Sequence, residues 1–399
     1  MTYLTSLETA TGERVSATTP RNCAAGDTLQ ARYDLDGIKR DYSREDFSRG
    51  PASLWRYAPL LPVQNPEHVV TLNEGFTPLV RTPRLARSLG LESLAVKDEG
   101  RNPSGTFKDR GASVAVSRYV ELGVKTVAHN SSGNAGGSWS LYCARAGITC
   151  VNILPTDAQP ASLQHCRAAG QPTYLLDNWH DGGRLVEEAC QRNGWMNICT
   201  LREPYRLEGK KTLGFEIAEQ LDWRMPDAIF YPVGGGLGAL AIYKGLYELQ
   251  RLGWVEGNVP RLYITQYEGC APVVKAFEEG RAECTPWGKI DIPPGGLKSP
   301  NPPGGRAVLN LIREHGGGAI PVATSEALAA VDELARAEGI FACPESATTL
   351  VGLRKAVARG WIKSSERVVL VSTGSGLKSI PTLSVPHFPT VTGSAQIHA

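Results

Sequence analysis

The chain lacks the features that mark membrane, secreted and polyanion-binding proteins. No stretch approaches the roughly 18 consecutive apolar residues of a membrane-spanning helix, so we expect no membrane partner. The N-terminus has no basic region followed by an apolar one, and we therefore expect no secretory signal. The formal net charge is only +2, which argues against nucleic acid as a partner recognised by bulk charge.

Patterns typical of metal sites and disulfide frameworks are also missing. The 9 cysteines are odd in number, irregularly spaced and without a Cys-x-x-Cys pair, and the 7 histidines have no ligand spacing. This usage favours reduced thiols in a cytoplasmic protein and predicts no metal site.

What the chain does contain is an alternation of apolar runs and helical patterns. Its 399 residues suffice for two or three packed units at about 150 residues per domain. From about residue 91 the alternation predicts an α/β protein with parallel sheets and right-handed crossovers. The expected strands are 94–97, 126–129, 148–154, 173–176, 228–233, 261–266 and 368–373, and the expected helices are 109–122, 136–146, 158–169, 181–193, 238–252 and 271–279.

Three segments fall outside this alternation. Residues 1–50 are polar, and we expect an extended arm with short strands. Residues 284–318 are rich in proline and glycine, which predicts a long loop region of the kind that often covers a functional site. The last residues, from about Ser384, are expected to be weakly structured.

One lysine stands in an unusual position. Lys108 follows a Pro/Ser/Gly turn and directly precedes an expected helix. The partial positive charge of a helix N-terminus disfavours a second cation and lowers the pKa of an amine there. A neutral lysine can attack a carbonyl group and form a Schiff base. Asp109 and Arg110 follow at once, so a solvated helix start is the alternative for this segment alone.

Four further segments are candidates for binding a ligand. Asn130-Ser-Ser-Gly-Asn-Ala-Gly-Gly137 opens a helix whose free amides suit a carboxylate or a phosphate, and a capped turn is the alternative. Gly234 to Gly238 lie between a strand and a helix and suit one phosphate, although the Lys-Ser/Thr of a P-loop is absent.

Ser372 to Leu377 place a hydroxyl after a strand, either facing a ring nitrogen or in a plain turn. Arg206, Lys210 and Lys211 suit an anionic substrate group, or a solvated charged turn.

Taken together, these segments describe a pyridoxal-phosphate site. The cofactor requires a lysine for its covalent link, a cup for one phosphate and a partner for its ring nitrogen. A hydroxyl partner leaves that nitrogen unprotonated, which favours elimination and replacement at the β or γ carbon of an amino acid.

The same stretches resemble a known family. The chain resembles the threonine synthases, within the tryptophan-synthase-β-like (fold type II) pyridoxal-phosphate enzymes, over roughly residues 50–380. The resemblance is carried by Ser53-Leu-Trp-Arg-Tyr, Glu74-Gly-Phe-Thr-Pro-Leu79, Asn102 to Gly111, Ser131-Ser-Gly-Asn134, Pro204-Tyr-Arg-Leu-Glu-Gly209, Gly234 to Gly238, Glu345-Ser-Ala-Thr348 and Thr373-Gly-Ser-Gly-Leu-Lys378.

The resemblance implies a fold and an assembly. It implies two three-layer α/β/α domains with parallel-rich sheets and the active site in the cleft between them. Residues 51–112 and 206–399 would form the large cofactor-binding domain, residues 113–205 a small mobile domain, and residues 1–50 the arm. It also suggests a homodimer.

The resemblance further implies a role for each site residue. Lys108 would carry the cofactor and move protons, Asn134 would bond the cofactor's 3′-oxygen, and Thr373 would face the pyridine nitrogen. The cofactor phosphate would lie on Gly234, Gly235, Gly236, Leu237 and Gly238. Ser131, Ser132 and Ala135 would line the pocket for the substrate carboxylate, and Arg206 would bind the substrate's distal phosphate.

Departures from the family pattern fall on the substrate side. Glu203 stands where an asparagine is usual, Ala135 where a threonine or serine is usual, and Ser375 where a histidine is usual. Cys23 is alone where some relatives have Cys-x-x-Cys. The first hypothesis, which the resemblance implies, is conversion of O-phosphohomoserine and water to threonine and phosphate. The alternatives are a β-replacement or β-elimination on a phosphoserine-like or other activated serine, as in cysteate synthase, and a non-catalytic cofactor-binding protein.

Overall fold

The larger of two parallel-rich sheets has six strands. A computed structural model describes residues 2–23 and 27–383, and the expectation for the residues after Ser384 lies outside this range. The strand order is β12-β11-β10-β13-β5-β4, with only β4 antiparallel to its neighbour. The strands are β4 (Leu79–Arg81), β5 (Ser93–Asp98), β10 (Ala228–Pro232), β11 (Arg261–Tyr267), β12 (Gly318–Val322) and β13 (Arg367–Ser372).

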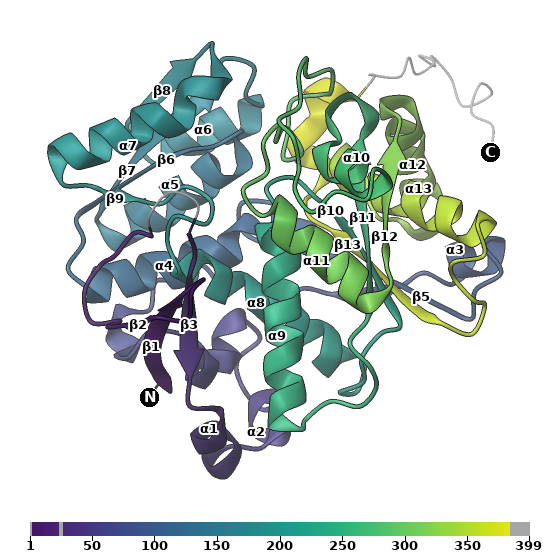
Figure 1. Cartoon of the computed structure of the whole chain (residues 1–399), viewed down its shortest axis with the longest axis horizontal. Helices are drawn as coiled ribbons and strands as arrows, with labels where there is room; N and C mark the ends of the chain where they lie inside the picture. Colours follow the sequence, from purple (N-terminus) through teal and green to yellow (C-terminus); the bar gives the residue numbers. More distant parts are fainter. Residues whose placement is uncertain (1, 24–26, 384–399) are drawn as a thin grey trace, which may run out of the picture.

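Helices cover both faces of this sheet (Figure 1). Side chains alternate along a strand, so Ile229 and Tyr231 join one core while Ala228 and Phe230 join the other. The first face packs against α8 (Tyr205–Gln220), α9 (Leu237–Leu252), α10 (Pro272–Glu278) and α11 (Gly305–His315), and the second against α3 (Pro83–Ser88), α12 (Thr324–Glu338) and α13 (Pro344–Ala358). The expected three-layer architecture is confirmed here.

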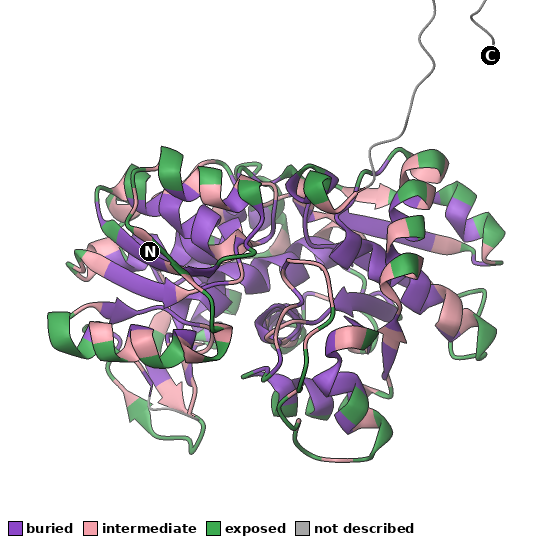
Figure 2. Ribbon diagram, turned by 90° about the horizontal axis from the view of Figure 1, so that it is seen from above, coloured by how far each residue is buried: buried purple, intermediate pink, exposed green. Residues whose placement is uncertain are grey.

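The smaller sheet is entirely parallel, in the order β8-β7-β6-β9. Val127 and Cys150 face one core, and Ala128 and Val151 face the other. The strands of this sheet are β6 (Thr126–Asn130), β7 (Thr149–Pro155), β8 (Thr173–Leu176) and β9 (Met196–Asn197). The helices in the same part of the chain are α4 (Lys108–Glu121), α5 (Asn134–Ala146), α6 (Pro160–Ala168) and α7 (Gly182–Asn193). In Figure 2 the strands of both sheets are largely buried, whereas the outer faces of the peripheral helices are exposed.

The N-terminal segment is more structured than an extended arm. It forms a three-stranded antiparallel sheet of β1 (Leu4–Thr9), β2 (Arg14–Val15) and β3 (Leu29–Tyr33). Two helices follow, α1 (Leu35–Asp41) and α2 (Arg44–Ser48), which the sequence did not indicate. The remaining short 3-10 helices are η1 (Leu54–Leu60), η2 (Pro66–His68), η3 (Glu99–Arg101), η4 (Trp179–Asp181), η5 (Glu268–Cys270) and η6 (Gly376–Thr382).

Two expectations from the sequence need correction. The segment 284–318 is not a loop throughout, because α11 occupies residues 305–315 and β12 begins at residue 318. Apolar Val308, Leu309 and Ile312 recur at helical spacing and bury one face of α11 against the sheet. The surrounding prolines and glycines obscured this spacing in the sequence. The charged stretch 203–212 is not a solvated turn either, since residues 205–212 form the buried start of α8.

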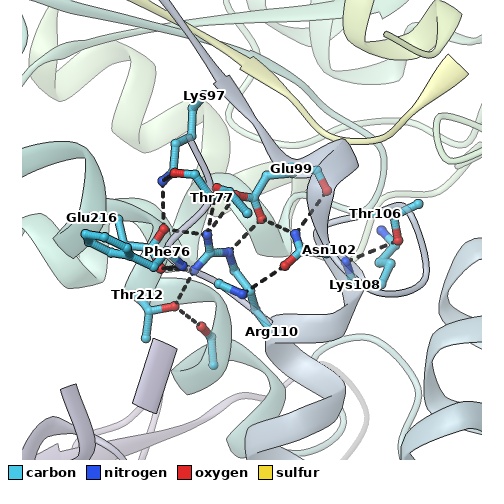
Figure 3. Close-up of polar contacts among 12 residues, drawn as sticks. Phe76, Thr77, Lys97, Glu99, Asn102, Thr106, Lys108, Arg110, Thr212 and Glu216 are labelled. Atoms are coloured by element: carbon cyan, nitrogen blue, oxygen red, sulfur yellow. Dashed lines mark hydrogen bonds and ion pairs between the residues drawn. The ribbon is translucent and has the colours of Figure 1, made fainter. Parts of the chain in front are cut away.

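A buried ionic network joins the large sheet to α4 and α8 (Figure 3). Arg110 donates two hydrogen bonds to Glu99, at 2.6 and 2.7 Å, and also bonds both carboxylate oxygens of Glu216. Lys97 donates to Glu216 at 2.7 Å. All four side chains are fully buried, so the two positive and two negative charges compensate each other away from water. Asp109 and Arg110 therefore do not form a solvated helix start.

The same network fixes the turn that precedes Lys108. Asn102 donates a 3.0 Å hydrogen bond to Glu99 and accepts one of 2.9 Å from the Gly75 amide. Because Asn102 begins the turn and Arg110 lies in the first turn of α4, both ends of the segment carrying Lys108 are attached to one rigid cluster.

Among residues 2–23 and 27–383 no helix is long and apolar enough to cross a membrane. All nine cysteines are free thiols, and eight of them are buried.

We expect Glu216→Gln to lower the free energy of unfolding by about 3–5 kcal/mol, because Arg110 and Lys97 then share a single carboxylate in a buried site. Urea denaturation followed by circular dichroism measures this. Arg336→Gln is the matched control, since it removes an exposed ion pair at 3.2 Å and should cost less than about 1 kcal/mol. A similarly small loss for Glu216→Gln would contradict a stabilising role for the network.

Candidate active site

One cavity of about 330 Å³ collects the residues that the sequence singled out. It is lined by segments that flank both parallel sheets, and all twelve predicted site residues border it. They are Lys108, Ser131, Ser132, Asn134, Ala135, Arg206, Gly234, Gly235, Gly236, Leu237, Gly238 and Thr373.

Lys108 is the first residue of α4 and lies within this cavity. Burial lowers the pKa of its amine to about 8, and the positive charge of Arg206 acts in the same direction. The sequence predicts a pKa lowered by the helix N-terminus, whereas in the structure removal of the amine from water is the largest cause. The Nζ atom lies 4.1 Å from the centroid of the Phe107 ring. At pH 7 roughly one-tenth of an amine with this pKa is neutral, far more than for an ordinary lysine, and this form is able to act as a nucleophile.

The loop after β6 turns sharply into α5. Gly133 has φ +135°, a backbone conformation that residues with a side chain rarely adopt. The Ser131 hydroxyl oxygen accepts hydrogen bonds from the amides of Gly133 (3.2 Å) and Gly136 (3.1 Å), so it caps the helix. The amides of Ser132, Asn134 and Ala135 donate to no acceptor in the described part of the chain. They are therefore available to an anion at the cavity wall.

The side chain of Asn134 is oriented by α6. Its Oδ1 accepts a 3.2 Å hydrogen bond from Ser162 Oγ, which places the amide nitrogen as the remaining donor.

The glycine-rich loop between β10 and α9 permits close approach of its backbone. A Cβ atom at Gly238 would lie 1.8 Å from the Tyr231 hydroxyl oxygen, and one at Gly234 would lie 2.4 Å from the Gly296 carbonyl oxygen. Gly236 has φ +89° and no side chain caps α9. Within residues 2–23 and 27–383, the amides of 234–238 find no hydrogen-bond acceptor. Such a row of free amides at a helix start fits one phosphate group.

Thr373 follows the last residue of β13 and is nearly buried. Its hydroxyl oxygen lies 3.3 Å from that of Ser346, whose own oxygen also accepts a 3.2 Å hydrogen bond from the Gly374 amide. Thr373 and Ser346 thus form a short chain of hydroxyls at the cavity, which suits a hydrogen bond to an unprotonated ring nitrogen.

Arg206 lies in the first turn of α8 and borders the same cavity as Lys108. Its Nε lies 3.6 Å from Glu203 Oε1, its Nη1 donates to Thr200 Oγ1 at 3.3 Å, and its guanidinium carbon lies 5.0 Å from the Trp139 ring centroid. Its Nη2 is buried and has no hydrogen-bond partner. The acidic residue at 203 is thus paired with Arg206, and one face of the guanidinium remains available to an anion.

Several residues of the cavity were not assigned to it from the sequence. Trp179 and His180 belong to η4, and Lys298 to Pro300 form part of the wall. This wall is fixed from both sides, because Glu345 accepts a 3.0 Å hydrogen bond from Gly296 N and Lys298 pairs with Asp157 at 2.6 Å. The proline and glycine content of 284–318 was the available signal for the wall, whereas nothing in the sequence indicated Trp179 or His180.

The residues present fit pyridoxal phosphate. A lysine with a lowered pKa, a row of free amides for one phosphate, a hydroxyl at the end of β13 and an oriented asparagine amide all border one cavity. We propose that these residues have the roles that the family resemblance implies for them.

The lowered pKa of Lys108 predicts unusual reactivity in the cofactor-free protein. An aldehyde with cyanoborohydride should label Lys108 with a rate that rises with pH and is half-maximal near about pH 8, since the neutral amine is the reactive form. Lysine in a model peptide, which titrates near about 10.4, is the reference. Peptide mapping by mass spectrometry gives the rates. A Lys108 profile equal to that of the peptide would contradict the effect of burial.

Comparison with known proteins places the chain in a family. Residues 70–374 match the model of the family described as "Pyridoxal-phosphate dependent enzyme". Threonine synthase from Methanosarcina acetivorans is 40% identical over 366 residues, which cover 91% of this chain and 89% of that protein. Threonine synthase from Methanocaldococcus jannaschii is 36% identical, covering 89% and 88% of the two chains.

Solved structures agree on the fold. Diaminopropionate ammonia lyase from Escherichia coli, in complex with an aminoacrylate-PLP azomethine reaction intermediate, superimposes with a TM-score of 0.66 at 17% identity, covering 96% of this chain and 97% of that one. The processed form of threonine deaminase isoform 2 from Solanum lycopersicum gives 0.62 at 21% identity, covering 75% and 79%. The chain therefore belongs to the pyridoxal-phosphate dependent enzymes of fold type II, and its sequence places it with the threonine synthases.

Proposed function

We propose that the enzyme is a lyase that converts O-phosphohomoserine and water to threonine and phosphate. The observation that carries the proposal is the position of Arg206, whose buried Nη2 is without a partner in the same cavity as Lys108. A substrate attached near Lys108 through its amino group would then meet a phosphate-binding side chain at its far end. Threonine synthases related to this chain at 32–40% identity support the same assignment.

Each part of the substrate has a matching group in the cavity. The free amides at the start of α5 suit its carboxylate, which the partial positive charge of a helix N-terminus stabilises. Ser131 positions these amides by capping the helix. The Arg206 guanidinium suits the phosphate, because its planar fork binds phosphate oxygens strongly.

Lys108 supplies both attachment and proton movement. When bound, pyridoxal phosphate stabilises negative charge on the substrate carbons near the amino group, which is the chemistry that the protein itself lacks. The Nζ atom of Lys108, with a pKa of about 8, can take up or release a proton near neutral pH. Proton transfer by one positioned amine contributes about 10²–10⁴-fold to a rate.

We also propose that residues 113–205 act as a small mobile domain against the large domain of residues 51–112 and 206–399. A homodimer in the cytoplasm is the assembly and location that we propose. Support for these points comes from the family resemblance and from nine free cysteines.

Incubation of the enzyme with O-phosphohomoserine should release phosphate and threonine in equal amounts. Lys108→Ala should lose the absorbance near about 410 nm that borohydride reduction also removes, together with activity. Amino-acid analysis and a phosphate assay measure the products. If O-phosphohomoserine is inert while phosphoserine with sulfite or with a thiol reacts, the β-replacement alternative is correct. If Lys108→Ala keeps both absorbance and activity, the assignment of the cofactor lysine is wrong.

Arg206→Ala should raise KM for O-phosphohomoserine by about 10- to 100-fold, because a charged hydrogen-bond donor to the phosphate is lost. Cofactor absorbance should be retained. Arg306→Ala, which removes an exposed arginine, is the control and should leave KM unchanged. An unchanged KM in Arg206→Ala would remove this residue from the phosphate site.

A further inference from the structure

A second cation stands beside Arg206 without a partner. Lys210 lies four residues after Arg206 on α8, so the two side chains share one helix face. The Lys210 side chain is 5% exposed and borders the cavity, and within residues 2–23 and 27–383 its amine forms no hydrogen bond or ion pair. Its Nζ lies 4.6 Å from the centroid of the Phe107 ring, the same ring that Lys108 Nζ approaches to 4.1 Å. The amines of Lys108 and Lys210 therefore both lie close to one aromatic ring that borders the cavity.

The adjacent lysine, Lys211, differs from Lys210 because it is paired with carboxylates. Lys211 pairs with Glu208 at 2.7 Å and with Glu248 at 2.8 Å, on the side of α8 that faces α9. Lys97 is likewise buried and paired, with Glu216 at 2.7 Å, so these two buried lysines have carboxylate partners that Lys210 lacks.

Glu203, the carboxylate whose charge acts on Lys210, is already occupied by other donors. Glu203 accepts hydrogen bonds from the Tyr119 hydroxyl at 2.9 Å and from the amides of Tyr205 (2.7 Å) and Arg206 (3.1 Å). It also pairs with the Arg206 Nε. Burial together with the charges of Lys108 and Arg206 holds the pKa of Lys210 well below its ordinary value, and Glu203 opposes this only in part.

An anion in the cavity would satisfy both free donors. A buried polar group without a partner costs free energy, and a charged one costs more. A phosphate monoester carries between one and two negative charges at pH 7 and three acceptor oxygens. The cofactor phosphate has its own donors in the amides of 234–238, which leaves Lys210 and the Arg206 Nη2 for a second phosphate.

We propose that Lys210 and Arg206 together form the binding site for the phosphate of the substrate, and that Lys210 makes the enzyme select a phosphorylated amino acid over one with a neutral leaving group. This inference rests on the proposed function, since it names a further residue that recognises the same substrate. Arg206 supplies the oriented fork, and Lys210 supplies a compact second charge.

The test compares two ligands in the holoenzyme. One is the phosphonate isostere of O-phosphohomoserine, in which a methylene replaces the ester oxygen so that phosphate cannot leave. The other is homoserine, which has no phosphate. Each ligand is added in increasing amounts to the wild type, Lys210→Met, Lys210→Arg and the exposed-site control Lys275→Met, and the change in cofactor absorbance gives Kd.

Lys210→Met should raise Kd for the phosphonate by about 10- to 100-fold and change Kd for homoserine by less than about 3-fold. Lys210→Arg should recover most of the phosphonate affinity, and Lys275→Met should match the wild type. An unchanged Kd for the phosphonate, or an equal weakening of both ligands, would overturn the inference, because a merely structural lysine does not distinguish them.

The result separates this inference from the proposed function. If the wild type makes no threonine from O-phosphohomoserine but Lys210→Met weakens phosphonate binding selectively, the phosphate site stands and the proposed reaction fails. If the wild type makes threonine and Lys210→Met binds the phosphonate as tightly as the wild type does, the reaction stands and the role of Lys210 fails.

Discussion

The contact between Arg110 and the carboxylates of Glu99 and Glu216 is the constraint on which the active site depends. It joins the end of β5, the first turn of α4 and the middle of α8, and Asn102 extends it to the turn before Lys108. Removing these charges from water is costly, and only mutual pairing in fixed geometry offsets that cost. Because the pairing is directional, the lysine that follows the turn is placed by a rigid cluster.

Two kinds of buried charge therefore occur in this protein. In the ionic network each charge has a partner, and the pKa of Glu216 is lowered to about 2 although burial alone would raise it. Around the cavity the cations Lys108, Arg206 and Lys210 exceed the free carboxylates, and burial lowers the pKa of both lysines. Paired charges hold the fold together, whereas incompletely paired charges are the ones that remain available to anionic ligands.

The position of the cavity follows from the parallel sheets. Lys108, Asn134, Gly234 and Thr373 all follow the carboxyl ends of strands, where connections leave a sheet and where helix starts present free amides. Both sheets contribute residues to the cavity: Asn134 follows a strand of the smaller sheet, and the other three residues follow strands of the larger one. A ligand with a phosphate at each end can thus be held by groups from different layers of the molecule.

The sequence by itself determined the strand–helix alternation, the order of the motifs and twelve of the residues that border the cavity. These depend on local patterns, such as apolar periodicity and glycines at turns that no larger residue allows. Three features depended on tertiary structure. The charges of residues 203–212 look solvated in sequence, yet α8 is buried because other elements of the fold pack on it, as where Tyr119 donates to Glu203 and Tyr33 donates to Glu208. The helix at 305–315 forms because the sheet covers its apolar face. The pKa of Lys108 falls chiefly through burial, since the low-polarity surroundings that disfavour its charge exist only once the chain has folded.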